Sequence, residues 1–397
     1  MNPFRYMRVE TVPEALAAMS GVALGEDVGT RPRLFAGGTN LLDLMKADVM
    51  HPVTLVDIGR LPLTQIERLP DGTLHLGAMA RNADTAEHPL VREHLPMLRA
   101  AILAGASGQI RNMATNGGNL LQRTRCYYFY DAGVPCNKRA PGSGCPAAHG
   151  LARQHAILGA NEHCIATHPS DMCVALAALG ATVHVESVRG AREIPMTEFH
   201  RLPGDRPDID TVLQPDELIT HISVPPNPYA GHGTYLKARE RASYAFALVS
   251  VAAALELYPD GMIRSARLAL GGVAHKPWRD LEAEAMLGGK PAADQTFADV
   301  AAFVLRDARA WGGPALPEGT PGNAFKIPLT ERAIVRALQM AAAGIVTNTG
   351  QDAFNANEGP GDGRHDGRHD GRHEEHYDRP DGAGDGSHRT IPPGEAP

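Results

Sequence analysis

The spacing of hydrophobic and polar positions in the first half of the chain predicts short strands interspersed with short helices. Thr11 and Glu14 have the Thr-x-x-Glu spacing of a helix-capping box and lead into the helical segment EALAAM. The compact apolar run Val53–Ile58 indicates a buried strand, and 65–69 with 73–79 indicates a hairpin about Asp71-Gly72. Further strands are expected over 34–36, 182–186 and 218–224, and further helices over 41–46, 97–104 and 172–179.

A second unit is predicted to begin near Gly231, after the boundary segment Pro225–Pro228. Two strands are expected around the turn 259–261, followed by segments with helical periodicity. The strands lie at 248–257 and 262–270, and the helices at 281–287, 297–308 and 330–345. This pattern predicts an α+β arrangement with an antiparallel sheet.

The composition from about Gln351 onward differs from that of the rest of the chain. Asp-Gly-Arg-His occurs three times in succession, at 362, 366 and 370, and almost no apolar residue remains to be buried. We therefore expect a disordered tail over 348–397, whose histidines offer at most weak metal binding.

Charge and composition exclude several classes of function. The formal net charge is -7, so no overall positive field favours nucleic acid, and no apolar run reaches the length of a membrane span. The N-terminal segment has no basic and apolar signal-peptide pattern, so no export signal is expected. The sequence contains neither Gly-x-Ser-x-Gly nor His-Glu-x-x-His, and no pattern indicates a nucleophile triad or a carboxylate pair.

Two glycine-rich segments have the composition of phosphate-binding loops. Ala36-Gly37-Gly38-Thr39-Asn40 follows a predicted strand, and Thr115-Asn116-Gly117-Gly118-Asn119 forms a second turn. Glycine lets backbone N–H groups approach an anion closely, so two such loops suit a dinucleotide. A tight strand-to-helix turn explains the first segment equally well, and neither segment has the Rossmann or P-loop spacing. Ser170-Asp171 precedes a helix and is suited to capping it or to binding a sugar hydroxyl.

The cysteines cluster between these features. Four of the five cysteines fall within residues 126–164, an odd total that argues against a disulfide framework. The four are Cys126, Cys136, Cys145 and Cys164, joined by turn-rich segments. Four thiolates suit a [4Fe-4S] cluster or a zinc ion, and the spacing does not discriminate between them. A nearby histidine (149, 155, 163 or 168) can replace one ligand, whereas Cys173 is expected to be a buried core residue.

These segments together resemble a known family. AGGTNLLDLMK, GQIRNMATNGGNLLQ, HPSDMCVALAALGA, LKARERASYAFALVSVAAAL and LALGGVAHKPWR are similar to the FAD-binding medium subunits of the xanthine dehydrogenase, or molybdenum hydroxylase, family. The resemblance runs from residue 1 to about 345. It implies a two-part FAD-binding domain of the PCMH type over 1–228, followed by a smaller CO-dehydrogenase-flavoprotein-like α+β domain over 229–347. The segment at about 122–167 is similar to the iron–sulfur insertion of periplasmic aldehyde oxidoreductase FAD subunits, which favours iron over zinc.

The resemblance also assigns roles to residues. Ala36, Gly37, Gly38, Thr39, Asn40 and Leu41 would hold the FAD pyrophosphate, and Ala114, Thr115, Gly118 and Asn119 the flavin side. Ser170 and Asp171 would bind sugar hydroxyls, and Leu218 or Ile219 would pack on the cofactor. Lys237 would lie near the isoalloxazine, although exposed charges at a domain edge explain Lys237 and Arg239 equally well. The four clustered cysteines would ligate a [4Fe-4S] cluster.

The implied function is electron transfer within a larger oxidoreductase. A large subunit with the molybdenum cofactor would oxidise an aldehyde, a small subunit would carry two [2Fe-2S] clusters, and this chain would pass electrons from FAD to an external acceptor. Such a complex would be cytoplasmic, or would be exported to the periplasm on a partner's signal. Two alternatives remain open: a flavoenzyme that acts alone, and a zinc-stabilised scaffold protein.

Overall fold

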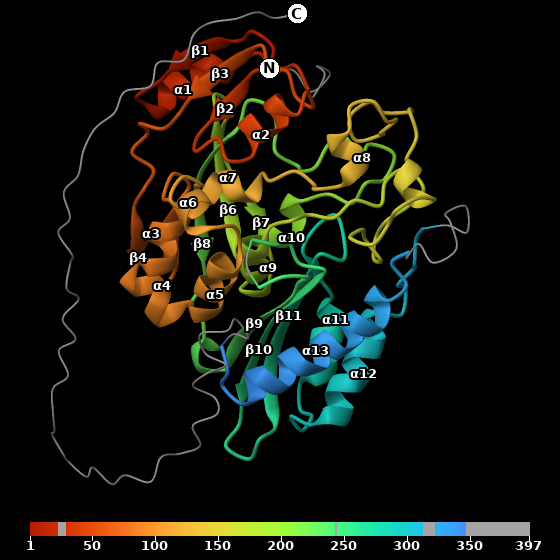
Figure 1. Cartoon of the computed structure of the whole chain (residues 1–397). Helices are drawn as coiled ribbons and strands as arrows, with labels where there is room; N and C mark the ends of the chain where they lie inside the picture. Colours follow the sequence, from red (N-terminus) through yellow and green to blue (C-terminus); the bar gives the residue numbers. More distant parts are fainter. Residues whose placement is uncertain (23–28, 243, 313–321, 347–397) are drawn as a thin grey trace, which may run out of the picture. The chain divides into compact units, whose positions relative to one another are not determined.

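The computed structural model describes residues 1–22, 29–242, 244–312 and 322–346. The predicted tail lies outside these residues. The first part is a small parallel sheet in the order β1-β3-β2, with β1 at Arg5–Arg8, β2 at Arg33–Phe35 and β3 at Thr54–Asp57. Helices α1 (Val12–Met19) and α2 (Leu41–Lys46) accompany the sheet (Figure 1).

The start of α1 follows from the sequence pattern. The Thr11 hydroxyl accepts a hydrogen bond from the Glu14 N–H at 3.3 Å, as expected of an N-cap. The Glu14 carboxylate accepts from the Glu10 N–H at 2.9 Å, one residue before the partner in a standard capping box. The apolar side of α1 packs against Val9 and Val56 in a small core of its own.

The second part is a five-stranded antiparallel sheet in the order β4-β5-β8-β6-β7. Its strands are β4 (Ile66–Arg68), β5 (Leu74–Gly77), β6 (Thr182–Ser187), β7 (Gly190–Pro195) and β8 (Leu218–Val224). The helices of this part are α3 (Asn82–Glu87), α4 (Pro89–His94), α5 (Pro96–Ala104), α6 (Gly108–Arg111), α7 (Asn116–Leu120), α9 (Asp171–Ala178) and α10 (Met196–Phe199). The cysteine-rich segment between α7 and α9 contains α8 (Tyr127–Tyr130) and the short 3-10 helix η1 (Pro146–Ala148).

The C-terminal part contains the antiparallel sheet that the sequence predicts. Its order is β12-β11-β10-β9, with β9 at Gly233–Ala238, β10 at Val249–Leu257, β11 at Ile263–Gly271 and the two-residue β12 at Trp278–Arg279. The 3-10 helix η2 (Ala230–His232) precedes β9, and α11 (Leu281–Leu287), α12 (Asp294–Val304) and α13 (Lys326–Ala342) follow the strands. Figure 1 shows these three helices beside the sheet, and their apolar sides form one core with β10 and β11.

Helices α5 and α9 link the two larger sheets. Their buried side chains share a core with Leu76 and Ile222 of the five-stranded sheet and with Tyr235 and Ala252 of the C-terminal sheet. Cys173, on α9, is fully buried there, which confirms its predicted core role. The packing also brings the first residues of α9 against β9, so Asp171 and Lys237 become neighbours.

Among the described residues, no helix combines the length and apolar character that crossing a bilayer requires.

Candidate functional site

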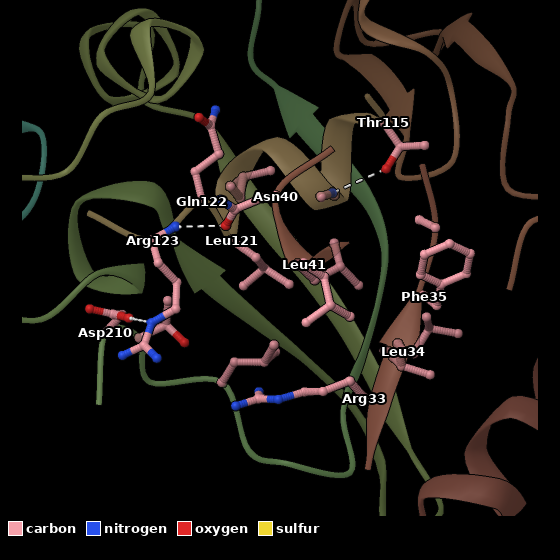
Figure 2. Close-up of a pocket in the computed structure, with 18 of the residues that line it drawn as sticks. Arg33, Leu34, Phe35, Asn40, Leu41, Thr115, Leu121, Gln122, Arg123 and Asp210 are labelled. Carbon is pink, nitrogen blue, oxygen red and sulfur yellow. Dashed lines mark hydrogen bonds and ion pairs between the residues drawn. The ribbon is translucent and has the colours of Figure 1, made fainter. Parts of the chain in front are cut away.

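A cavity of about 240 Å³ lies where the first two parts of the fold meet. Its walls come from β2, the glycine loop after β2, the first turn of α7 and the residues after it, and the segments 208–211, 213–215 and 217–219. Figure 2 shows Leu34 and Phe35 on one side and Gln122 and Arg123 on the other. The two glycine-rich segments therefore face a common cavity, as a shared ligand would require.

The first glycine loop needs glycine for two different steric reasons. A Cβ atom on Gly37 would lie 1.8 Å from the backbone oxygen of Met113, so the two loops touch through their backbones. Gly38 has a φ of +72°, which L-residues with a side chain rarely adopt. The loop continues into α2, where the Leu42 N–H donates to the Gly38 oxygen and the Leu44 N–H to the Asn40 oxygen, each at 3.1 Å, and where Leu41 lines the cavity.

The second glycine segment is a short helix and not the predicted turn. Thr115 is the N-cap of α7, and its hydroxyl accepts from the Gly118 N–H at 3.2 Å (Figure 2). Gly117 donates its N–H to the Ala78 oxygen at 2.8 Å, which holds the helix against β5. The propensity of the Asn-Gly-Gly sequence for turns was overridden by this capping and by burial of Asn116.

Asn40 connects the two walls of the cavity and keeps one donor available. Its side-chain oxygen accepts from the Arg123 N–H at 3.0 Å (Figure 2). Its Nδ2 is buried without a hydrogen-bond partner among the described residues, and so is Nδ1 of His200, which also lines the cavity. Buried polar atoms are rarely left unsatisfied, so Asn40 Nδ2 fits a polar ligand in the cavity, whereas the His200 side chain also lies in a buried group with His168 and Cys173.

Charged side chains of both signs line the cavity, with Asp208, Asp210 and Glu217 on the same wall as three arginines. Arg31, Arg33 and Arg123 lie on its wall and suit a cofactor with a pyrophosphate. Arg123 donates from Nε to Asp210 at 2.8 Å, and Lys138 pairs with the other oxygen of Asp210 at 2.5 Å. Burial opposes ionisation of Asp210, yet Lys138 and Arg123 outweigh burial and hold its pKa below the usual range.

These charged residues were not predicted as part of the site. Arg123 lies three residues before Cys126, and Asp210 lies in a stretch that the sequence marks only as a loop. A basic residue near a glycine loop, as at Arg33, is the one available signal. No sequence pattern indicates that the segment 208–215 closes the cavity.

The predicted cofactor residues fall into two groups in the structure. Ten of them line the cavity: Ala36, Gly37, Gly38, Thr39, Asn40, Leu41, Thr115, Gly118, Leu218 and Ile219. The other five lie outside its wall: Ala114, Asn119, Ser170, Asp171 and Lys237. Asn119 is the link between the groups, because its side-chain oxygen accepts from Gln122 of the wall at 2.8 Å and from Ser170 at 2.5 Å.

Asp171 and Lys237 form a buried ion pair behind this link. Lys237 Nζ lies 2.8 Å from Asp171 and 2.9 Å from the Ala104 oxygen, and Tyr235 donates its hydroxyl to Asp171 at 2.6 Å. Burial, followed by the Asp171 charge, raises the pKa of Tyr235 well above its usual value, so the phenol stays protonated. The alternative of an exposed edge charge is wrong for Lys237, which is buried on β9.

The structure brings the four clustered cysteines to one small pocket. Cys126, Cys136, Cys145 and Cys164 all line it, together with backbone and side chains from the turns between them. Burial raises the pKa of the Cys126 thiol to about 12. Cys145 and Cys164 hydrogen bond to each other, which lowers the pKa of Cys145 and, with burial, raises that of Cys164 to about 11.

The groups around the thiol pocket suit an anionic metal–thiolate centre. No aspartate or glutamate is among the described residues that line the pocket, and Lys138 lies beside Cys136 in it. Cationic and N–H groups stabilise the negative charge that four thiolates bring. The donor set fits both a [4Fe-4S] cluster and tetrathiolate zinc.

The four candidate replacement histidines lie in different places. His155 is buried, with Nε2 at 3.0 Å from the Cys126 sulfur, and burial, followed by the Lys326 charge, lowers its pKa to about 4. His163 lines the thiol pocket, whereas His149 is exposed. The His168 ring instead lies tilted against the His200 ring, with ring centroids 4.1 Å apart.

Known proteins resemble this chain over most of its length. A family model described as the FAD binding domain in molybdopterin dehydrogenase matches residues 2–227, and one described as the CO dehydrogenase flavoprotein C-terminal domain matches residues 234–316. The aldehyde oxidoreductase FAD-binding subunit PaoB of Escherichia coli (strain K12) is 47% identical over 346 residues, covering 86% of this chain and 99% of that protein. The glyceraldehyde dehydrogenase medium chain of Sulfolobus acidocaldarius is 29% identical, covering 76% and 86%.

Solved structures show the same fold. The carbon monoxide dehydrogenase of Hydrogenophaga pseudoflava has a chain that matches with a TM-score of 0.64 and 26% identity, covering 87% of this chain and 99% of that one. A chain of reconstituted CO dehydrogenase from Oligotropha carboxidovorans matches with a TM-score of 0.65 and 23% identity, covering 86% and 98%. The expected order of a two-part cofactor domain and a smaller α+β domain is thereby confirmed.

Proposed function

Since the chain belongs to the FAD-binding medium subunits of the xanthine dehydrogenase family, we propose that it is the electron-transferring subunit of a molybdenum-containing aldehyde oxidoreductase. The observation that carries the proposal is the pairing of an FAD-type cavity with a four-thiol pocket in one chain. The 47% identical relative is named as an aldehyde oxidoreductase subunit, which supports aldehyde as the substrate class of the complex.

In this proposal the cavity residues hold FAD. The backbone of Gly37, Gly38 and Leu41 binds the pyrophosphate, with Arg33 supplying positive charge. Asn40 Nδ2 donates to the cofactor, because it has no other partner among the described residues. Bound FAD accepts electrons from one donor and releases them to another, and the protein positions it and controls access.

The buried ion pair of Asp171 and Lys237 belongs to the flavin end in this proposal. The chain Gln122–Asn119–Ser170 runs from the cavity wall to the start of α9, next to Asp171. Ser170 and Asp171 bind sugar hydroxyls, and Lys237 adds positive charge near the isoalloxazine. Binding would require these side chains to exchange their present hydrogen bonds for cofactor contacts.

The four-thiol pocket holds a [4Fe-4S] cluster in this proposal. Cys126, Cys136, Cys145 and Cys164 are the ligands, which the absence of acidic groups from the described wall of the pocket supports. The aldehyde is oxidised on a partner large subunit that contains molybdenum, and a small subunit with [2Fe-2S] clusters delivers the electrons. This chain then reduces an external acceptor.

The first test is a visible absorption spectrum of the full-length chain, purified without oxygen, with assays of iron, zinc and acid-labile sulfide. Flavin bands, about four irons and about four sulfides per chain are expected, since a [4Fe-4S] cluster has four of each. Flavin with zinc would keep the FAD role and overturn the cluster. A colourless protein that FAD does not reconstitute would overturn both.

A pair of variants tests which thiols bind the cluster. Cys136→Ser should lower the iron and sulfide content, because it removes one of the four pocket thiols. Cys173→Ser is the matched control, since this cysteine is buried on α9 outside the pocket. Equal iron content in the two variants would remove Cys136 from the ligand set.

The complex is tested by co-expression with candidate large and small subunits. Addition of an aldehyde to the assembled complex should bleach the flavin band of this chain. Bleaching by aldehyde of the isolated chain would favour the flavoenzyme that acts alone.

A further inference from the structure

His155 lies against one of the four pocket thiols. Its Nε2 is 3.0 Å from the Cys126 sulfur, and its side chain is 2% exposed overall. Its Nδ1 is buried and has no partner among the described residues. A thiolate bound to a metal has no proton to donate, so in a loaded centre this contact is an N–H···S hydrogen bond from the imidazole.

The C-terminal part of the fold fixes His155 from behind. Lys326 and Asn323, both fully buried, donate to the His155 backbone oxygen at 2.8 Å and 3.2 Å. Lys326 also donates to the oxygen of Gly272, after β11. A buried lysine held by two carbonyls is costly to misplace, so the imidazole is presented to Cys126 in one position.

A second histidine, His275, lies beside the cysteine-rich segment. It follows β11, and the backbone beside it is bonded to the cysteine-rich segment, with Ala274 accepting from the His168 N–H at 3.0 Å. The Cys164 thiol is the pocket group that the ring interacts with. Both ring nitrogens are buried without a hydrogen-bond partner among the described residues. A sulfur acceptor in the pocket would satisfy one of them.

A hydrogen bond to a ligand sulfur changes how readily an iron–sulfur cluster accepts an electron. Reduction adds negative charge, part of which falls on the sulfurs, so an N–H donor stabilises the reduced form more than the oxidised form. A fixed donor on Cys126, and a second one from His275 to Cys164 in the loaded centre, would therefore raise the potential. Neither histidine is a ligand in the four-thiolate assignment.

We propose that His155 and His275 are positioning residues whose N–H···S hydrogen bonds to Cys126 and Cys164 set the reduction potential of the cluster. The inference rests on the proposed [4Fe-4S] site. Because both donors are held by residues of the C-terminal part, that part of the chain controls a centre whose thiols all lie in the N-terminal part.

The test is a potentiometric titration, followed by electron paramagnetic resonance, of the full-length chain purified without oxygen. Four variants are compared with the wild-type chain: His155→Phe, His155→Gln, His275→Phe and His149→Phe. Phenylalanine keeps a ring and removes the donor, glutamine restores an N–H donor, and His149 is exposed in the same segment. Iron and sulfide are measured on each sample.

The two buried phenylalanine variants should keep their iron and reduce at more negative potentials. We expect up to about a tenfold shift of the reduction equilibrium per donor, which for one electron is about 59 mV. His155→Gln should regain much of the wild-type potential, and His149→Phe should not shift. Unchanged potentials in both buried variants, at full iron content, would overturn the inference and leave the cluster in place.

The iron content of the variants and of the wild-type chain also tests the proposal. Loss of iron from His155→Phe would make His155 a ligand or a purely structural residue, and loss from His275→Phe would do the same for His275; loss from both overturns the proposal. A wild-type chain without iron and sulfide would remove the cluster itself, and with it the proposed function of the thiol pocket.

Discussion

Substitution of Gly37 by alanine should separate the two glycine-rich loops and weaken FAD binding. The new Cβ would lie 1.8 Å from the Met113 oxygen and 2.7 Å from the Met113 carbonyl carbon. The first distance is about 1.6 Å shorter than ordinary van der Waals contact, and both obstacles are backbone atoms that no rotamer change can move.

The magnitude follows from the cost of overpacking. Inserting a methyl group into a close-packed contact costs about 1–3 kcal/mol. If this strain is relieved by displacing one loop from the cofactor, each 1.4 kcal/mol weakens binding tenfold, so the affinity for FAD should fall by about 5- to 140-fold. The loops move as backbone, so the loss cannot be recovered by side-chain rearrangement.

Two further glycines supply a graded control. A Cβ on Gly118 would meet only the Thr115 hydroxyl, at 2.9 Å, and that side chain can rotate at the cost of its capping bond. A Cβ on Gly108, at the start of α6, would meet nothing within 4 Å. Binding of FAD to the apoprotein should therefore weaken most in Gly37→Ala, less in Gly118→Ala and not in Gly108→Ala.

The assay is quenching of flavin fluorescence on titration of each apoprotein, with a thermal melt of the same samples. Wild-type affinity in Gly37→Ala would refute the reasoning, because it would show that the touching loops do not hold the cofactor. If the thermal melt shows that the apoprotein of Gly37→Ala is unfolded, the prediction is tested by the other two variants. Gly118→Ala must then bind FAD more weakly than Gly108→Ala.

Two predictions concern buried charge, and both are read from denaturant unfolding of the apoprotein. Asp210→Asn leaves Lys138 and Arg123 without their carboxylate and should lower the free energy of unfolding by about 2–3 kcal/mol. The loss is smaller than for a fully buried ion pair because the Asp210 side chain is 29% exposed. An unchanged free energy of unfolding would show that solvent replaces the carboxylate. Burial lowers the pKa of His200 to about 4, so the unfolded chain takes up the proton first as the pH falls. The contribution of His200 to the free energy of unfolding should therefore be complete above pH 6.5 and decrease towards pH 4, by at most about 3 kcal/mol. His200→Gln keeps a donor for the Leu120 oxygen and should flatten that decrease. An equally steep decrease in the variant would contradict the assignment of this pH dependence to His200.

Local patterns predicted the elements that depend on local physics. The capping threonine at position 11, the helix over 41–46 and the strand over 218–224 all occur where the sequence places them. Capping and the burial of one face of an element depend on a few neighbouring residues, so hydrophobic periodicity and cap residues predict these helices and strands. The Asn116-Gly117 segment was predicted as a turn and is helical, because its N-cap and its contact with β5 outweigh the propensity of the two residues.

Local sequence patterns did not predict the contacts between segments that are distant in the sequence. Edge strand β1 is exposed along its length and lacks the apolar alternation that marks a strand, so it was not predicted. The pairing of Asp210 with Arg123 spans 87 residues, and neither residue type is unusual in its local context. His275 and Cys164 likewise meet only because β11 ends beside the cysteine-rich segment.

One short stretch of backbone serves both candidate centres. The Arg123 N–H bonds Asn40 at the cavity, its guanidinium bonds Asp210, and three residues later Cys126 enters the thiol pocket. Lys138, two residues after Cys136, returns to the same Asp210. Loss of the metal would release Cys126 and Cys136 together, and the strain would reach the cavity wall through Arg123 and Asp210. A cluster bound there would therefore be coupled mechanically to FAD binding even if it carried no electrons, so a loss of FAD from cysteine variants would not by itself identify the cluster as a relay.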